Sequence, residues 1–244
     1  MTIKIAYFNV QSGVGTTKGY LHYLTSFWKY FLPHSQNEIV RTAEFINSEG
    51  INVITFSEID GGSLRSEYIN QVKLISNLTN LKINKFFPTY QIMGVLNQGN
   101  SINTKYPILV TKNHKLRGTG EPRYLGETML LIDEKKVTIL VTQLSLEKNN
   151  RINQIEDIAN IINKMKGPII LSGDFNTEDK LELDIMNKTR LKKVVNLKTY
   201  PSWNPNKSLD YILLSEEFDV KRSYSLKSIK VSDHLPLIVE ISLN

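Results

Sequence analysis

Acidic, amide and imidazole side chains recur at the C-terminal ends of short apolar runs that are typical of β-strands. They are Asn9, Glu58, Asp174, Asn176, Asp210 and the neighbouring pair Asp233 and His234. A single acid at a strand end is usually solvated or caps a helix. Six such positions, at the ends of five strands, point instead to one crevice, because α/β folds place ligands at strand ends. Carboxylate and amide oxygens of this kind would hold a hard metal ion.

Two of these positions follow a buried strand that ends at Gly173. Gly173 frees the backbone to turn, and alternate spacing along the strand predicts that Asp174 and Asn176 project to the same side. The other interpretation is that Asn176 or Thr177 caps the next helix.

A carboxylate and an imidazole stand side by side in Ser232-Asp233-His234, directly before the last apolar run. A lone histidine is more often structural. Next to an aspartate and before a strand, His234 becomes a good partner for a phosphate or a proton.

The composition narrows the chemistry further. The 244 residues include no cysteine and four histidines, which excludes disulfides, thiolate nucleophiles, Cys-based zinc sites and iron–sulfur clusters. Hydrophobic residues make up 41% and charged residues 22%, as in globular proteins that bury a large core. The net charge of +6 suits polyanions such as nucleic acid or acidic lipid surfaces, although a lysine- and asparagine-rich composition makes many proteins mildly basic.

The apolar periodicity predicts strands that alternate with helices. Strands are expected over 3–10, 51–59, 129–132, 137–144, 169–172, 209–214 and 235–241, and helices over 37–48, 67–79 and 147–165. This mixture predicts an α/β fold with two sheets packed face to face and flanked by helices. No repeat or linker interrupts the pattern, so residues 1–244 are expected to form a single domain.

The segment from Tyr20 to Phe31 contains six aromatic side chains, at a spacing typical of an amphipathic helix that ends before Pro33. The first expectation is a helix that packs on the core and leaves some rings exposed. The alternatives are a lip that stacks on substrate or a patch that meets a phospholipid membrane surface. There is no secretory-signal pattern and no apolar run near ~18 residues, which favours a cytoplasmic location.

The ordered positions resemble the motifs of the endonuclease/exonuclease/phosphatase superfamily, which includes deoxyribonucleases and exonuclease III-like enzymes. The matching stretches, in chain order, are Asn9 on the first strand, Ser57-Glu58, Gly173-Asp-Phe-Asn176, Leu209-Asp210-Tyr211 and Ser232-Asp-His234. The segment 99–107 is similar to a further strand of the family, and the resemblance extends from residue 3 to residue 242. Segments 28–34 and 60–66 resemble a bacterial subgroup.

The resemblance implies a four-layer α/β/β/α sandwich made of two mixed sheets flanked by helices. It also implies hydrolysis of a phosphodiester or phosphomonoester with Mg²⁺ or Mn²⁺. Glu58 would be the principal metal ligand, assisted by Asp233 and, through water, by Asn9.

The same resemblance implies the remaining roles. Asp174 would orient or deprotonate the attacking water, and Asn176 would hold that water and a phosphate oxygen. Asp210 would pair with His234 and fix a protonated imidazole against the phosphate. These roles suit the reaction, because phosphate-ester hydrolysis needs an in-line water, a base and positive charge at the non-bridging oxygens.

Three positions depart from the family pattern or match it only over a short stretch. Gln143 stands where the family usually has a histidine or tyrosine, and it can donate a hydrogen bond to substrate but cannot supply a proton. Gln11 stands where abasic endonucleases have an aspartate, which weakens that specific interpretation. Arg123 is a candidate phosphate contact, against the alternative of an ordinary surface charge.

The leading hypothesis is therefore a metal-dependent phosphodiesterase that acts on DNA or RNA. The alternative is a phosphodiesterase or phosphatase that acts on a phospholipid headgroup or a soluble phosphate ester. A third hypothesis, from another class, is a non-catalytic module that binds nucleic acid or membranes on the same scaffold. No obligate protein partner is indicated.

Overall fold

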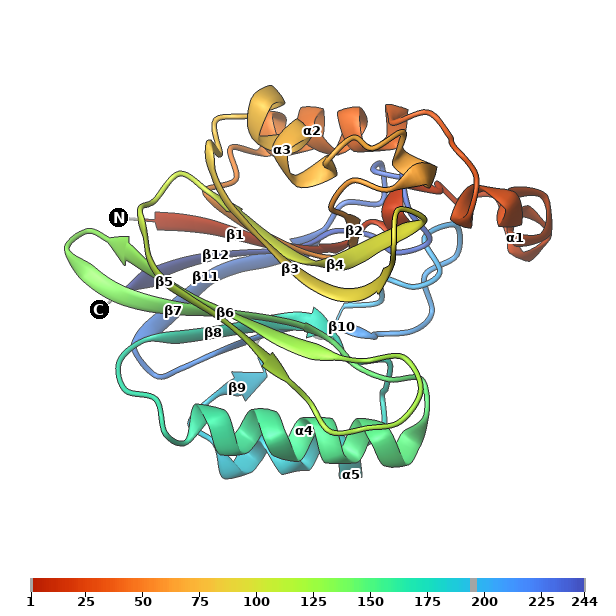
Figure 1. The fold of residues 1–244 in the computed structure, drawn as a ribbon. Helices are drawn as coiled ribbons and strands as arrows, with labels where there is room; N and C mark the ends of the chain where they lie inside the picture. Colours follow the sequence, from red (N-terminus) through yellow and green to blue (C-terminus); the bar gives the residue numbers. More distant parts are fainter. Residues whose placement is uncertain (1, 194–196, 244) are drawn as a thin grey trace.

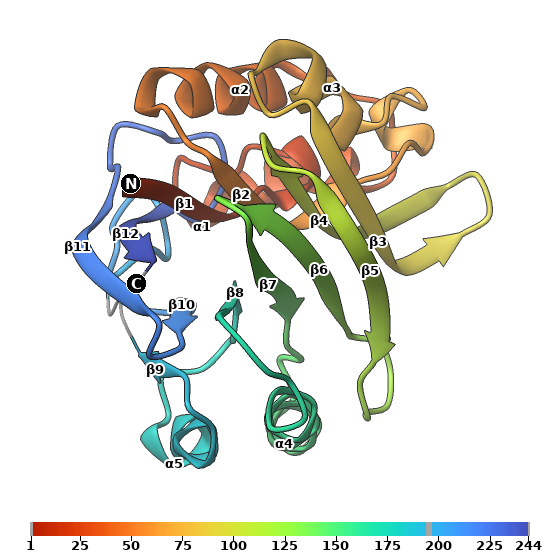
Figure 2. The same ribbon diagram turned by 90° about the vertical axis from the view of Figure 1, so that its left-hand side faces the viewer.

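Two six-stranded sheets pack face to face at the centre of the protein, as its computed structural model shows for residues 2–193 and 197–243 (Figures 1 and 2). The first sheet has the strand order β11-β12-β1-β2-β4-β3, and the second has the order β5-β6-β7-β8-β10-β9. The strands are β1 (Thr2–Asn9), β2 (Val53–Asp60), β3 (Ile83–Ile92), β4 (Leu96–Thr104), β5 (Ile108–Lys115), β6 (Tyr124–Ile132), β7 (Lys135–Gln143), β8 (Ile169–Asp174), β9 (Lys192–Lys193), β10 (Asp210–Leu214), β11 (Phe218–Ser225) and β12 (Leu237–Leu243).

Helices cover the outer face of each sheet (Figure 1). The helices α2 (Asn37–Glu49) and α3 (Gln71–Leu78) lie on the first sheet, and α4 (Lys148–Ile162) and α5 (Lys180–Leu183) lie on the second. Short 3₁₀ turns are η1 (Gln11–Gly13), η2 (Phe27–Tyr30), η3 (Leu64–Ser66) and η4 (Asp184–Lys188). This arrangement confirms the expected four-layer α/β/β/α sandwich.

Three apolar layers hold the sandwich together. The layer between the sheets includes Ile5, Ile139, Ile212 and Val239, the layer under α2 and α3 includes Phe8, Phe45 and Val72, and the layer under α4 includes Leu140, Ile155 and Ile158. Because β1 and β8 are apolar on both faces, they sit in the middle of their sheets with buried side chains throughout most of their length.

Strand direction brings the predicted polar residues to one edge of the sandwich. β1 and β2 run parallel, as do β7 and β8, so their C-terminal ends meet there. β10 is antiparallel to β8 and β12 is antiparallel to β1, so these two strands begin at the same edge. The expectation that every position follows a strand end is therefore wrong in detail. Glu58 lies inside β2, Asp210 begins β10, and Asp233 and His234 precede β12.

The element boundaries differ from the expectation in two further ways. The apolar pattern does not predict β3, β5 or β11, because most of their side chains are at least partly exposed and many are polar. The helix expected over 67–79 begins only at Gln71. Glu67 and Tyr68 have positive φ angles of 53° and 59°, and the Asn70 side chain caps the helix by accepting a hydrogen bond from the Lys73 backbone N–H.

The aromatic segment forms α1 (Tyr20–Ser26) followed by η2, and it projects from the end of the sandwich where the site lies (Figure 1). The expectation of a helix that packs on the core and leaves only some rings exposed is wrong. None of the six aromatic side chains belongs to the three apolar layers, and Tyr20, Phe27, Trp28 and Phe31 are exposed. In the part of the chain that the structure describes, we find no helix that is both long and apolar enough to cross a bilayer.

Candidate active site

Asp174, Asp210 and His234 form a buried group at the shared edge. Asp174 ends β8 and Asp210 begins β10, and the two residues are direct partners in the antiparallel register. His234 Nδ1 donates a hydrogen bond to Asp210 Oδ2 at 2.8 Å, and Nε2 lies 3.9 Å from Asp174 Oδ2. Asp210 and His234, which the sequence analysis pairs, are therefore in direct contact.

The surrounding charges set the ionisation of this group. Burial by itself would lower the pKa of His234, but Asp210, Asp174 and Asp233 raise that pKa well above its ordinary value. Burial raises the pKa of Asp174 to about 7, with His234 opposing this shift and Asp210 adding to it. A protonated imidazole thus stands beside a carboxyl group that can exchange a proton near neutral pH.

Loops fix the position of His234. The Leu235 backbone N–H donates to the Thr199 carbonyl at 2.9 Å, and the Ser202 N–H donates to the Asp233 carbonyl at 2.7 Å. The ring of Tyr200 packs against the imidazole with 4.9 Å between the ring centres. The segment around residue 200 therefore orients the histidine as well as lining the site.

Glu58 reaches the site through a local distortion of β2. The pairing of β2 with β4 shifts register between Phe56 and Ile59, and Glu58 has a left-handed φ of 52°. Such a conformation costs energy in a non-glycine residue and persists only where its surroundings hold it. Ser12 Oγ donates to the Glu58 carbonyl at 2.9 Å and helps to hold it.

Two amides bind the Glu58 carboxylate from opposite sheets. Asn9 Nδ2, at the end of β1, donates to Glu58 Oε1 at 2.9 Å and also lies 3.3 Å from Asp174 Oδ2. Gln143 Nε2, at the end of β7, donates to the same Oε1 at 2.6 Å. Asn9 and Gln143 therefore act as clamps on the acidic residues, and the Asn9 amide oxygen is occupied by the Gln11 backbone N–H.

Arg123 extends this chain of contacts. Its Nη1 donates to Gln143 Oε1 at 2.7 Å, and its Nη2 donates to Glu121 Oε2 at 3.1 Å. Arg123 is largely buried and lines the cavity, so the alternative that it is an ordinary surface charge is wrong. The Gln143 amide is bonded to two side chains, Arg123 and Glu58, and so belongs to the polar network of the site.

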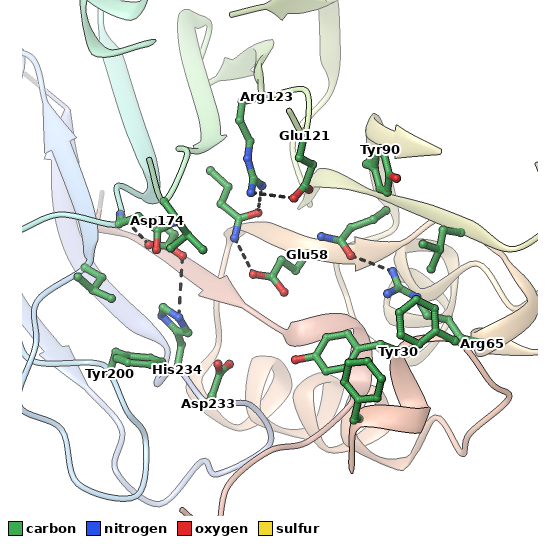
Figure 3. A pocket seen from close by; sticks show the side chains of 18 of the residues that line it. Tyr30, Glu58, Arg65, Tyr90, Glu121, Arg123, Asp174, Tyr200, Asp233 and His234 are labelled. Carbon is green, nitrogen blue, oxygen red and sulfur yellow. Dashed lines mark hydrogen bonds and ion pairs between the residues drawn. The ribbon is translucent and has the colours of Figure 1, made fainter. Parts of the chain in front are cut away.

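Asp233 faces Glu58 across the cavity (Figure 3). Tyr23 Oη donates to Asp233 Oδ2 at 2.6 Å, and Ser232 Oγ donates to Oδ1 at 3.1 Å. Burial raises the pKa of Asp233, His234 opposes this shift, and Glu58 adds to it. The two carboxylates are thus close enough to repel each other.

Asn176 lines the cavity beside Asp174 but does not cap a helix. It has a φ of 52°, which asparagine tolerates, and its backbone N–H donates to Asp174 Oδ1 at 3.0 Å. Its Nδ2 donates to the Leu144 carbonyl at 2.9 Å. The cap of α5 is Asp179, so the capping interpretation of Asn176 and Thr177 is wrong.

The site opens into a cavity of about 710 Å³. Of the nine predicted residues, seven line it, namely Glu58, Arg123, Gln143, Asp174, Asn176, Asp233 and His234, while Asn9 and Asp210 stand behind them. Sequence reasoning did not assign Arg65, Tyr200 or Lys207, which also line the cavity, and it reached Tyr30 only as part of an aromatic segment that could stack on substrate. They come from loops and turns, where no periodicity marks a site.

Gln11 links the aromatic segment to the site. Its Nε2 donates to Tyr30 Oη at 2.7 Å, and its Oε1 accepts from the Thr16 backbone N–H at 3.0 Å. Figure 3 shows Tyr30, Glu58 and Asp233 directed toward the same part of the cavity. Gln11, which departs from the abasic-endonuclease pattern, therefore ties the aromatic segment to the residues beside the site.

The donor set around Glu58 and Asp233 fits a hard divalent cation. Neither carboxylate forms an ion pair with a lysine or arginine in residues 2–193 and 197–243, and the hydrogen bonds to Glu58 come from neutral amides. Two facing carboxylates without a lysine or arginine partner are what Mg²⁺ or Mn²⁺ would neutralise. Asp174, Asp210 and His234 also have suitable spacing for a metal. There, however, the imidazole already supplies the positive charge and its Nδ1 is engaged.

Comparisons with known proteins agree with this architecture. The pattern of the Endonuclease/Exonuclease/phosphatase family matches residues 6–234. The "UPF0294 protein" of Vibrio campbellii is 27% identical over 124 residues, and the match spans 49% of this chain but only 42% of that curated relative.

Two solved structures show the same fold. An endonuclease/exonuclease/phosphatase from Beutenbergia cavernae superposes with a TM-score of 0.80 at 16% identity, covering 100% of this chain and 72% of that one. A mannosyl-6-phosphatase from Bacteroides thetaiotaomicron superposes with a TM-score of 0.71 at 16% identity, covering 99% and 100% of the two chains.

Proposed function

This chain belongs to the endonuclease/exonuclease/phosphatase family, and we propose that it is a divalent-metal-dependent hydrolase of a phosphodiester. The observation that carries the proposal is the position of Asp174. This residue lies beside the Asp210–His234 pair, and it lines the same cavity as Glu58 and Asp233.

Glu58 and Asp233 would hold the metal, with Asn9 keeping the Glu58 carboxylate in place. A bound Mg²⁺ or Mn²⁺ would supply positive charge to a non-bridging phosphate oxygen. Gln143 fixes the Glu58 carboxylate from the opposite sheet, and Arg123 fixes Gln143.

Asp174 acts as the base in this proposal. With a pKa of about 7, it is ionised in a large fraction of molecules near neutral pH and can accept the proton of an attacking water. As the new P–O bond forms, the P–O bond to the leaving alkoxide breaks. The alkoxide takes a proton from solvent water and leaves as the alcohol, and Asp174 later returns its proton to solvent. The imidazolium of His234, held by Asp210, stabilises the negative charge on the phosphate. Asn176 borders the position of the water.

Two substrate classes each have an observation in their favour. The net charge of +6 and the cavity-lining Lys207 favour nucleic acid. The exposed aromatic segment at the cavity mouth favours a phosphate ester at a phospholipid surface. The mannosyl-6-phosphatase shares the fold, which makes soluble phosphate esters a necessary comparison.

The test is an activity panel with Mg²⁺ or Mn²⁺ on plasmid, single-stranded DNA, RNA, inositol phosphates and phospholipid vesicles, with Asp174→Asn as the blank. Metal-dependent turnover that the blank lacks supports the proposal. For a nucleic-acid substrate, log affinity should fall linearly with log salt concentration. Binding of nucleic acid or vesicles with no turnover of any substrate would favour the non-catalytic module instead.

A further inference from the structure

Large apolar side chains remain exposed to solvent in the segments that supply part of the cavity lining. We call them the apolar rim; they come from α1, η2, the β3–β4 hairpin and the loop after β7. The rim comprises Tyr20, Leu21, Leu24, Phe27, Trp28, Phe31, Leu32, Tyr90, Ile92, Met93 and Leu146. Leu21 is 78% exposed, Leu24 77% and Met93 98%. An exposed apolar cluster of this kind marks an interaction surface rather than an ordinary protein exterior.

The rim and the cavity are continuous. Phe27, Phe31, Tyr90 and Leu146 belong to the rim and also line the cavity that contains Asp174 and His234. Figure 1 shows α1 projecting at the end of the sandwich where the site lies. Whatever covers the rim therefore also covers the entrance to the site.

Hydrogen bonds hold the rim in a fixed position. Tyr23 binds Asp233 and Tyr30 binds Gln11, so the aromatic segment is attached to the site itself. Lys29 Nζ also donates to the Val14 carbonyl at 3.0 Å.

The turn η3 connects the two halves of the rim. The His34 N–H donates to the Arg65 carbonyl at 3.0 Å, and the Leu64 N–H donates to the Gly94 carbonyl at 3.1 Å. Arg65 is itself held by Asp60 at 2.7 Å. The segments 28–34 and 60–66, which resemble a bacterial subgroup, thus contact each other and help to hold the rim in position.

The charge around the rim suits an anionic partner. No aspartate or glutamate occurs in residues 1–37 or 68–120, which supply nearly all of the rim. Lys18 is exposed in the loop that leads into α1, and Lys207 is exposed at the cavity. An apolar surface with few acids and nearby lysines is the combination that binds anionic lipid surfaces.

The side-chain types favour lipid over nucleic acid. Bases stack on flat rings, but the four most exposed rim residues are the aliphatic side chains of Met93, Leu146, Leu21 and Leu24. The cavity arginines are also already paired, Arg65 with Asp60 and Arg123 with Glu121, which leaves fewer cations for a nucleic-acid backbone.

We infer that the apolar rim docks on an anionic phospholipid surface and turns the cavity toward the headgroups. The phosphate ester that the proposed hydrolase cleaves would then be presented at that surface. The docking itself does not depend on the reaction, whereas the identity of the substrate rests on the proposed function.

The test is cosedimentation of the full chain with vesicles, in EDTA, so that no hydrolysis is needed. Vesicles of phosphatidylcholine with added phosphatidylglycerol are compared with vesicles of phosphatidylcholine alone. The rim variant is Leu21→Ser/Leu24→Ser/Met93→Ser. The matched control is Leu78→Ser/Leu109→Ser/Leu181→Ser, which replaces three exposed leucines elsewhere.

Wild type and control should bind the anionic vesicles, more weakly as salt rises, and the rim variant should bind at least about tenfold more weakly. Hydrolysis of soluble bis(p-nitrophenyl) phosphate by the rim variant should equal that of wild type, because these three side chains do not line the cavity. Absence of wild-type vesicle binding, or equal binding by the rim variant, would overturn the inference. The inference would also be overturned if wild type bound single-stranded DNA but no vesicles, and the rim variant lost the DNA binding. Vesicle binding without turnover of any substrate would instead contradict the proposed function and leave docking intact.

Discussion

Gln143 and Glu58 stand in different sheets and are joined by a hydrogen bond of 2.6 Å from Nε2 to Oε1. The bond ties the end of β7 to the distorted part of β2, across the layer between the sheets. Since Arg123 holds the other end of the Gln143 amide, the Glu58 carboxylate is oriented by a chain of two side chains rather than by one.

Removing this bond should impair catalysis without unfolding the protein. Gln143→Ala removes one preorganised donor, so we expect kcat/KM to fall by about 10²-fold. The half-saturating Mg²⁺ concentration should also rise, because Glu58 loses its orientation. Titration of activity with Mg²⁺ measures both effects. Gln91→Ala, an exposed amide outside the cavity lining, is the control, and wild-type kinetics in Gln143→Ala would assign Gln143 to the scaffold.

Glu58 should control metal affinity. Glu58→Gln removes one of the two carboxylates that would hold the ion, so activity should fall far more at low Mg²⁺ than at saturating Mg²⁺. EDTA should abolish the activity of wild type, and Mg²⁺ or Mn²⁺ should restore it. Undiminished turnover in EDTA would rule out the metal-dependent mechanism.

The pH dependence of kcat/KM should have two limbs. Activity should rise through about pH 7 as Asp174 ionises, since burial raises its pKa to about 7. It should fall at alkaline pH as His234 loses its proton, because the neighbouring aspartates hold the pKa of His234 well above its ordinary value. Asp210→Asn removes the largest contribution that raises this pKa, so the alkaline limb should move to lower pH. An unchanged alkaline limb in that variant would show that His234 does not produce it.

Ionisation of Asp174 should lower the free energy of unfolding. Its folded-state pKa of about 7 exceeds the value of 3.8 for a free side chain, so the unfolding free energy should decrease as pH rises from about 4 to about 7. Asn cannot ionise. Asp174→Asn should therefore be more stable than wild type by about 1–4 kcal/mol near pH 8, and by less near pH 5. Urea denaturation in EDTA at the two pH values measures this, and a stability difference that does not grow with pH would contradict it.

Much of the fold could be predicted because burial leaves a strong apolar pattern. β1, β2, β7 and β8 lie in the middle of their sheets, and their side chains are almost continuously buried. β3 and β5 lie at sheet edges and carry polar residues such as Asn84 and Lys112, so their sequences give no clear alternation. Pairing with a neighbouring strand, rather than the local sequence, makes them strands.

Site residues that belong to a sequence motif could be predicted. Residues that only the folded chain brings to the cavity could not. Asp174 and His234 stand next to recognisable stretches, and the structure brings them together. Tyr30 is held at the cavity by a hydrogen bond from Gln11, a residue 19 positions earlier in the chain. A contact of this kind is not visible in the sequence. Likewise, the amino-acid sequence around Glu58 does not indicate the left-handed backbone conformation that turns its carboxylate toward Asn9.

The direct pairing of Asp174 with Asp210 has a consequence for how this molecule tolerates change. Strand register, rather than the length of the intervening chain, sets the distance between these two acids. Extra residues inserted beside the exposed Asn187 and Lys188 would enlarge the outside of the molecule and leave the β8–β10 ladder as it is. A one-residue deletion inside β10 would instead turn every later side chain of that strand to the opposite face. The turn at Asn187 and Lys188 can thus lengthen without moving the two acids, while the strand β10 cannot change length in the same way.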